Sequence, residues 1–157
     1  MFWVEAMWVW LQRTAFAGLV LSAIASSLSA AEQVGKATLI ATAVTGDGAP
    51  LAAKSPVHRN ERIKTSGTGL GEFLFSDGTK FAVGSNSSVV IDKFVYAGDS
   101  SVQNLTINAA KGSFRWISGG SKSSAYKIAT PAGTIGIRGT AFDVFIGRGG
   151  ATAVVLL

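Results

Sequence analysis

The sequence contains no cysteine and a single histidine, His58, among 157 residues. The absence of cysteine excludes disulfide bonds, thiol catalysis and cysteine-bound zinc, but it leaves the cellular compartment open. One histidine also excludes any metal site built from several histidines. Helical periodicity is scarce: beyond Glu32 no stretch keeps a period of 3.6 residues, so we expect helix in the N-terminal segment alone.

Charged residues make up 15% of the chain, with a formal net charge of +5, and they occur singly rather than in runs of like sign. A positive balance can favour anionic polymers, lipid head groups or an acidic partner. Scattered cations also fit an ordinary solvated surface, so both interpretations stay open. Hydrophobic residues at 48% are enough to build a core and argue against disorder.

Nineteen glycines and nine phenylalanines accompany many Val, Ile and Thr residues. Short apolar runs end at turn signals roughly every 8–12 residues, a spacing typical of all-β folds. The strongest hairpin signal is Asp77-Gly78, between apolar runs at Glu72–Phe75 and Lys80–Val83, because Asp-Gly accepts the positive φ of a tight turn. The sequence therefore predicts short antiparallel strands in a sandwich-like or solenoid-like domain.

Alternation assigns faces to several of these strands. Phe114 and Trp116 should share one face with Arg115 opposite, and we expect Val102–Ala109 and Ser113–Ile117 to be separate strands. Trp116 is then expected in the core, and a platform on which a sugar stacks is its alternative role. In the same way, Phe142 and Val144 should face away from Asp143.

Residues 1–31 differ from the rest of the chain. Arg13 precedes an apolar stretch, and Ser29-Ala30-Ala31 offers small side chains before Glu32, which is the order of a secretory signal. Cleavage would begin the mature chain at Glu32 and leave one β domain, residues 32–157. The segment before Arg13 is unusually apolar, so a retained N-terminal anchor is the alternative.

The segment Lys127–Ile146, KIATPAGTIGIRGTAFDVFI, is the most distinctive part of the domain. Proline cannot donate to a sheet ladder, and glycine permits positive φ or close backbone approach, so we interpret the motif as structural rather than chemical. Its marker residues are Thr130, Pro131, Gly133, Gly136, Arg138, Gly139, Thr140 and Phe142.

This segment resembles the signature of the FecR-type domain, named after a ferric-citrate regulator of Gram-negative bacteria. Two upstream elements are similar to that family as well: the Asp-Gly hairpin in Leu74–Gly84 and the strand-Lys-Gly-strand element in Leu105–Trp116. The resemblance runs from about Val34 to the end of the chain. The last run, Ala151–Leu157, is strongly apolar, so we expect a truncated domain whose final strand needs a partner.

In the best-understood members of the family this domain is periplasmic. It relays the state of an outer-membrane receptor through a membrane helix to a cytoplasmic segment that controls a sigma factor, and the resemblance implies a related role here. No cytoplasmic segment precedes the leader here, so direct sigma-factor control is not expected to carry over. We expect an exported, non-enzymatic sensing or protein-interaction module of the Gram-negative periplasm or cell surface. We expect an envelope protein as partner, no cofactor, no nucleic acid, and membrane contact through the leader alone if it is uncleaved.

The alternative function is a cell-wall or polysaccharide-binding module that uses exposed aromatic residues such as Tyr96, Tyr126 or Trp116. RNA binding is disfavoured, because Thr140 replaces a stacking aromatic in the partial match to an RNA-recognition strand. The carboxylates form no recognisable catalytic pair or calcium loop, and His58 is interpreted as a solvated loop residue.

Arg138 is the side chain that we single out. Its guanidinium group is expected to bind backbone carbonyls and to pair with Asp143, which would stabilise the fold. Contact with a ligand or partner is the alternative role.

Overall fold

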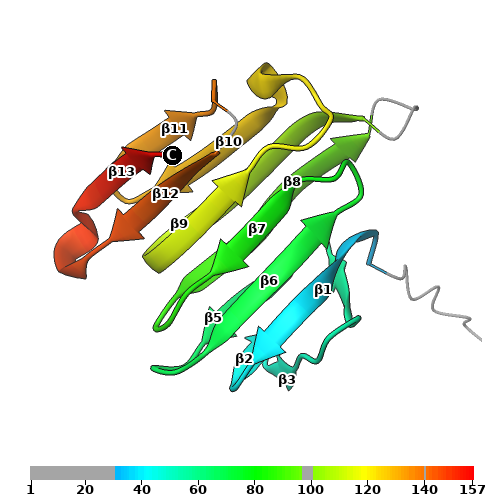
Figure 1. Ribbon diagram of the computed structural model, residues 1–157, viewed down its shortest axis with the longest axis vertical. Coiled ribbons are helices and arrows are strands. Elements are labelled where there is room, and N and C mark those ends of the chain that lie inside the picture. The colour runs from blue at the N-terminus through cyan, green and yellow to red at the C-terminus, as the bar shows by residue number, and fades with distance from the viewer. Residues whose placement is uncertain (1–30, 97–100, 140) are drawn as a thin grey trace, which may run out of the picture.

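The computed structural model describes residues 31–96, 101–139 and 141–157, and these consist mainly of β-strands (Figure 1). The strands are β1 (Gln33–Ala41), β2 (Val44–Gly46), β3 (Ala49–Pro50), β4 (Pro56–His58), β5 (Arg62–Thr65), β6 (Leu70–Phe75), β7 (Lys80–Val83), β8 (Ser88–Tyr96), β9 (Val102–Ile117), β10 (Tyr126–Thr130), β11 (Gly133–Gly136), β12 (Ala141–Ile146) and β13 (Thr152–Leu156). Two short 3₁₀ turns, η1 (Ser123–Ala125) and η2 (Arg148–Gly150), are the helical elements of the described part. The predicted all-β fold is confirmed, whereas the helical leader lies outside the described residues.

The strands form two layers that share the long strand β9. The first sheet has the order β4-β1-β6-β7-β9-β12-β13, and the second has the order β3-β2-β5-β8-β9-β10-β11. Neighbouring strands are antiparallel except for β9 and β10, which run parallel. Figure 1 shows the first sheet with β5 and β8 behind it. The fold is thus one curled sheet, a half-barrel whose two layers face each other, and it is close to the sandwich-like alternative that the sequence predicts.

Strand β9 passes from the second sheet to the first. Residues 102–111 pair with β8 and β10, and residues 112–117 pair with β7 and β12. The bend falls at Gly112, whose φ of 110° suits glycine, and a Cβ there would overlap Ser87. The two strands predicted on either side of this glycine are therefore one continuous strand with a corner.

The chain also passes between the two sheets in the β5–β6 and β7–β8 connections. Hydroxyl groups link these connections to the bend in β9. The Thr65 Oγ1 donates to the Gly84 carbonyl oxygen at 2.6 Å and accepts from the Ser87 backbone N–H at 2.9 Å. Ser87 Oγ in turn accepts from the Ser113 backbone N–H at 3.1 Å. Ser87 is 1% exposed, so these bonds satisfy polar groups that would otherwise be buried without partners. We call this region, around Thr65, Ser87 and Gly112, the corner.

Aromatic residues from both sheets meet in the core. Phe75 of β6 contacts Phe94 of β8 with ring centroids 5.9 Å apart, and Trp116 of β9 contacts Tyr126 of β10 at 5.3 Å. Trp116 has no exposed surface, as alternation predicts for it. Truncation of such a ring to alanine typically costs about 3–5 kcal/mol, so these contacts hold the layers together.

The two lateral edges of the sandwich differ. At one edge the short strands β3 and β4 are joined by residues 51–55, and Leu51 packs against the core. At the opposite edge, among the strands that the structure describes, β11 pairs with β10 alone and β13 pairs with β12 alone. Figure 1 shows β11 and β13 at the same side of the molecule. We call this second side the open edge.

Candidate functional site

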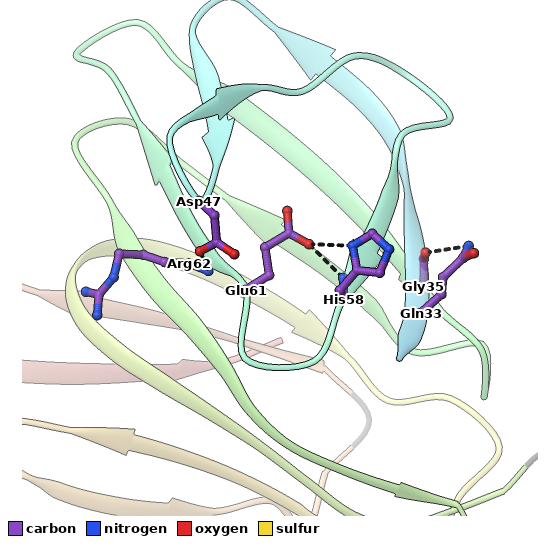
Figure 2. A network of polar contacts seen from close by, with 6 residues as sticks. All are labelled: Gln33, Gly35, Asp47, His58, Glu61 and Arg62. Carbon is purple, nitrogen blue, oxygen red and sulfur yellow. Dashed lines mark hydrogen bonds and ion pairs between the residues drawn. The ribbon is translucent and has the colours of Figure 1, made fainter. Parts of the chain in front are cut away.

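A polar cluster beside β4 has a structural explanation (Figure 2). The Glu61 carboxylate accepts the His58 backbone N–H at 2.6 Å and lies 3.3 Å from the His58 ring Nδ1. Gly46 leaves room for this carboxylate, because a Cβ at Gly46 would overlap Glu61 Oε1. Glu61 is buried and His58 is half-buried in β4, so the prediction of a solvated loop histidine is wrong. In the described part of the chain, no three His, Asp or Glu residues gather as a metal site.

A second polar cluster centres on Asp77 in the β6–β7 turn. Asp77 Oδ2 accepts from the Tyr126 hydroxyl at 2.7 Å and from Ser121 Oγ at 2.9 Å. Asp77 Oδ1 accepts from the Thr79 backbone N–H at 3.0 Å, while the Asp77 carbonyl oxygen accepts from the Gly120 N–H at 2.8 Å. Gly78 has a φ of 83°, as its turn requires. The Asp-Gly turn thus anchors the loop that carries the chain from β9 to β10.

This loop closes over the aromatic core. The Trp116 indole N–H donates to Ser118 Oγ at 3.0 Å, and Ser118 Oγ donates to the Gly139 carbonyl oxygen at 3.0 Å. Trp116 is 0% exposed and Tyr126 is 1% exposed. Neither ring can stack on a sugar. The alternative in which Trp116 or Tyr126 is an exposed aromatic residue for polysaccharide binding is therefore wrong for both residues. The side chain of Tyr96 lies outside the described residues.

Arg138 differs from its predicted role. Its side chain is exposed, and it makes no hydrogen bond or ion pair with residues 31–96, 101–139 or 141–157. Asp143 pairs instead with Arg115, the residue opposite it on β9, through two hydrogen bonds of 2.7 Å. The expected Arg138–Asp143 pair is therefore wrong, because strand register and not sequence proximity selects the partner.

The Arg115–Asp143 pair changes the acidity of both groups. Hydrogen bonds from Arg115 hold the pKa of Asp143 below its usual value, and the same bonds raise the pKa of Arg115. The guanidinium group is about half exposed, which limits the contribution of the pair to stability. The pair orders the outer face of the first sheet rather than forming a catalytic group.

The remaining motif residues shape the β10–β11 hairpin and its neighbour β12. Thr130 Oγ1 donates to the Gly133 carbonyl oxygen at 2.9 Å across the turn that contains Pro131. Gly133 has a φ of 145°, and Phe142 is buried in the core. Nothing approaches the Cβ positions of Gly136 and Gly139, and neither has a positive φ, so close packing does not explain these two glycines. Thr140 lies outside the described residues.

The open edge is the surface that the motif strands build. Val154 and Leu156 of β13 point to the core side beside Val144 and Phe142, yet they are 44% and 78% exposed. On the outer side, Val155 is 50% exposed. The free backbone of β13 and these apolar side chains suit the addition of another extended segment. The expected last strand does find a partner in β12, but its other side remains unpaired within the described residues.

A hollow of about 390 Å³ lies on the outer face of the first sheet, over β6, β7, β9 and β12. Phe145 of β12 lines it and is 47% exposed, and Leu70 and the Arg115–Asp143 pair line it as well. No residue of β13 lines this hollow, and β12 separates it from the free edge of β13. A segment added to β13 would therefore contact the apolar side chains of β13 itself and not the hollow.

Comparison with known proteins gives one match. The family model for the FecR protein matches residues 61–157, which include β5 to β13 and all the motif residues. The match begins later than the resemblance expected from Val34. No curated protein and no solved structure matches the chain. Within the described residues, no helix has the length and apolar character needed to cross a bilayer.

Proposed function

The chain belongs to the FecR family, and we propose that it is an exported, non-enzymatic module of the bacterial envelope that senses or relays a signal by binding another protein. Family membership and the secretory pattern of residues 1–31 support this function. The FecR family is not a family of enzymes.

The open edge is the observation that carries the proposal. Residues 151–157 contain no charged side chain, and β13 has a ladder partner on one side alone among the described strands. Exposed apolar edge strands are usually protected by lysine, proline or a covering element, because they pair readily with other chains. An extended segment of an envelope partner that adds to β13 would gain main-chain hydrogen bonds and bury Val154 and Leu156.

Site-specific crosslinking tests this proposal. Because the chain lacks cysteine, a single introduced cysteine provides a unique attachment point for a photoactivated crosslinker. Val155→Cys places it at the open edge, and Val95→Cys is the matched control, since Val95 is a similarly exposed valine on β8 of the other sheet. We expect a discrete adduct with one envelope protein from position 155 and none from position 95.

Two results would contradict the proposal. Adducts of equal yield from both positions, or none from either, would remove the open edge as a specific site. An adduct of two copies of this chain would assign the edge to self-association instead of an envelope partner.

Export is tested separately. The protein should fractionate with the envelope, and N-terminal sequencing should begin at Glu32 if the leader is cleaved. A mature chain that starts at Met1 or Met7 would exclude cleavage and favour a retained anchor.

A further inference from the structure

We propose that the outer face of the second sheet binds a linear acidic polysaccharide. Four cations project from three of its strands: Arg62 and Lys64 from β5, Lys93 from β8 and Lys127 from β10. Strand β9 lies among them and presents polar side chains. We call this surface the cationic face, and its polar residues are Asn104, Thr106 and Asn108.

Alternation places these side chains on one face. Ile63, Ile107 and Ile128 are buried in the core, so their sequence neighbours project outward. The register then aligns Lys93, Thr106 and Lys127 in one row across three strands. Because adjacent strands lie about 4.8 Å apart, the two lysines of this row stand about 10 Å apart with Thr106 between them.

A second row lies beside the first. Arg62 aligns with Val90, Asn108 and Ala129, and these small or polar residues line a hollow of about 420 Å³. Arg62 and Lys64 are two residues apart on β5 and therefore share this face at a spacing of about 7 Å. The cations thus surround a shallow surface of small and polar side chains, along which an extended ligand can lie.

The four cations are not neutralised by the described part of the protein. The ion pairs found there join His58–Glu61, Arg59–Glu32 and Arg115–Asp143. Asp47 accepts the backbone N–H of Arg62, and Figure 2 shows the Arg62 guanidinium directed away from that carboxylate.

Asp92 is the acid beside these cations, and it is half-buried at the bulge before Lys93. The outer face of the first sheet carries both signs instead, with Glu72 and Asp143 among its cations. The positive charge is therefore asymmetric between the two faces.

The chemistry of the face favours a polysaccharide over other polyanions. Amide and hydroxyl side chains on β9 can bond sugar hydroxyls, while the cations meet carboxylates or sulfates. None of the described side chains of this face is aromatic, so bases of a single-stranded nucleic acid have no stacking platform there. Attachment to a bilayer surface is strengthened by large apolar side chains that insert beside the cations, and among the described residues of this face Val95 is the exposed apolar side chain.

The test compares two double variants with equal loss of charge. Lys93→Gln with Lys127→Gln removes the row on the cationic face, and Lys36→Gln with Lys80→Gln removes two exposed lysines from the first sheet. Binding is measured by calorimetry with polygalacturonate as the acidic polysaccharide, neutral dextran as a control, and phosphatidylglycerol vesicles as a competing anionic surface. Circular dichroism monitors the thermal midpoint of each variant.

We expect polygalacturonate to bind the unaltered chain and dextran not to bind. The Lys93/Lys127 variant should lose at least about tenfold in affinity and show a weaker dependence on salt, because two ionic contacts are removed. The Lys36/Lys80 variant should stay within about twofold, which is less than half the free-energy change of a tenfold loss. Arg62→Gln provides an independent single variant with the same expected direction.

Several results would overturn the proposal. Equal losses in the two double variants would indicate a response to net charge alone. Binding to vesicles without binding to polygalacturonate would assign the face to lipid, and no binding to either would remove the site. This test is independent of the open edge, since none of the substituted residues belongs to β11, β12 or β13.

Discussion

At the residue scale, single polar side chains fix the loops of this sandwich. Asp77 joins its own turn to the β9–β10 loop, although Tyr126 lies 49 residues later in the chain. Glu61 closes the β4–β5 turn in the same way, through the backbone of His58. Asp77 uses both carboxylate oxygens as acceptors, which an asparagine at that position cannot do because one of the oxygens becomes an NH₂ group.

Replacement of Asp77 tests this role. In Asp77→Asn an amide NH₂ replaces one of the two oxygens that accept hydrogen bonds, so either the Thr79 N–H or the Tyr126 and Ser121 hydroxyl protons lose their acceptor. We expect the free energy of unfolding to fall by about 1–3 kcal/mol in urea titrations. Asp47→Asn is the matched control: its single bond to the Arg62 N–H survives in asparagine, and its φ of 47° suits that residue. Equal losses in the free energy of unfolding for the two substitutions would show that the hydrogen bonds of Asp77 add no more stability than the single bond of Asp47.

The Arg115–Asp143 pair makes a pH-dependent contribution at the same scale. Because the folded-state pKa of Asp143 is lowered, its contribution is present above the unfolded pKa of about 4 and is lost as pH falls through the folded pKa. Asp143→Asn should therefore lower the thermal midpoint slightly at neutral pH, and the difference should vanish once acid protonates Asp143 in the folded protein. Glu72→Gln on the same face, outside the ion pairs of the described chain, serves as the control. A midpoint difference that persists in acid would point to packing rather than charge.

At the scale of elements, β9 determines how the layers are joined. Its residues belong to both sheets, and its bend lies beside the hydroxyl groups that connect β5, β7 and β8 at the corner. Gly112, the residue at this bend, has a φ of 110°, a conformation that most side chains disfavour.

Substitution of that glycine should be costly. Gly112→Ala places a Cβ against buried Ser87 at a φ of 110°, and we expect a loss of about 1–3 kcal/mol or more in the free energy of unfolding. Gly136→Ala is the matched control, since nothing lies within 4 Å of its Cβ position. It should leave stability unchanged or raise it slightly, because alanine restricts the unfolded chain. Urea titration of both variants compares them directly, and similar costs would contradict the assigned role of the bend.

At the scale of the whole molecule, the sandwich is closed at one edge and open at the other. Leu51 and the β3–β4 connection cover the core at the closed edge, whereas Val154 and Leu156 remain exposed at the open one. The proposed protein-binding site and the cationic face use different surfaces, so one module can bind two partners of different chemistry at once.

This asymmetry predicts an order of local stability. Amide hydrogens of β11 and β13 should exchange faster than those of the central strands, because each has one ladder neighbour among the described strands and little buried surface. Those of β7, β8 and β9 should exchange slowest and together, because β9 links both sheets into one unit. Hydrogen exchange followed by mass spectrometry measures this order. Separate exchange rates for β7 and β8 would show that the two layers open independently.

The sequence alone determined the all-β class, the buried faces around Phe114, Trp116 and Phe142, and the turn at Asp77-Gly78, because alternation and turn chemistry act between neighbouring residues. It also carried the family signature. Only the tertiary structure decided that residues 102–117 form one bent strand, that Asp143 pairs with Arg115 and not Arg138, and that His58 binds Glu61. It likewise placed four scattered cations on one face and left β13 unpaired on one side. These outcomes depend on strand register and on the crossing between sheets, which bring together residues far apart in the chain.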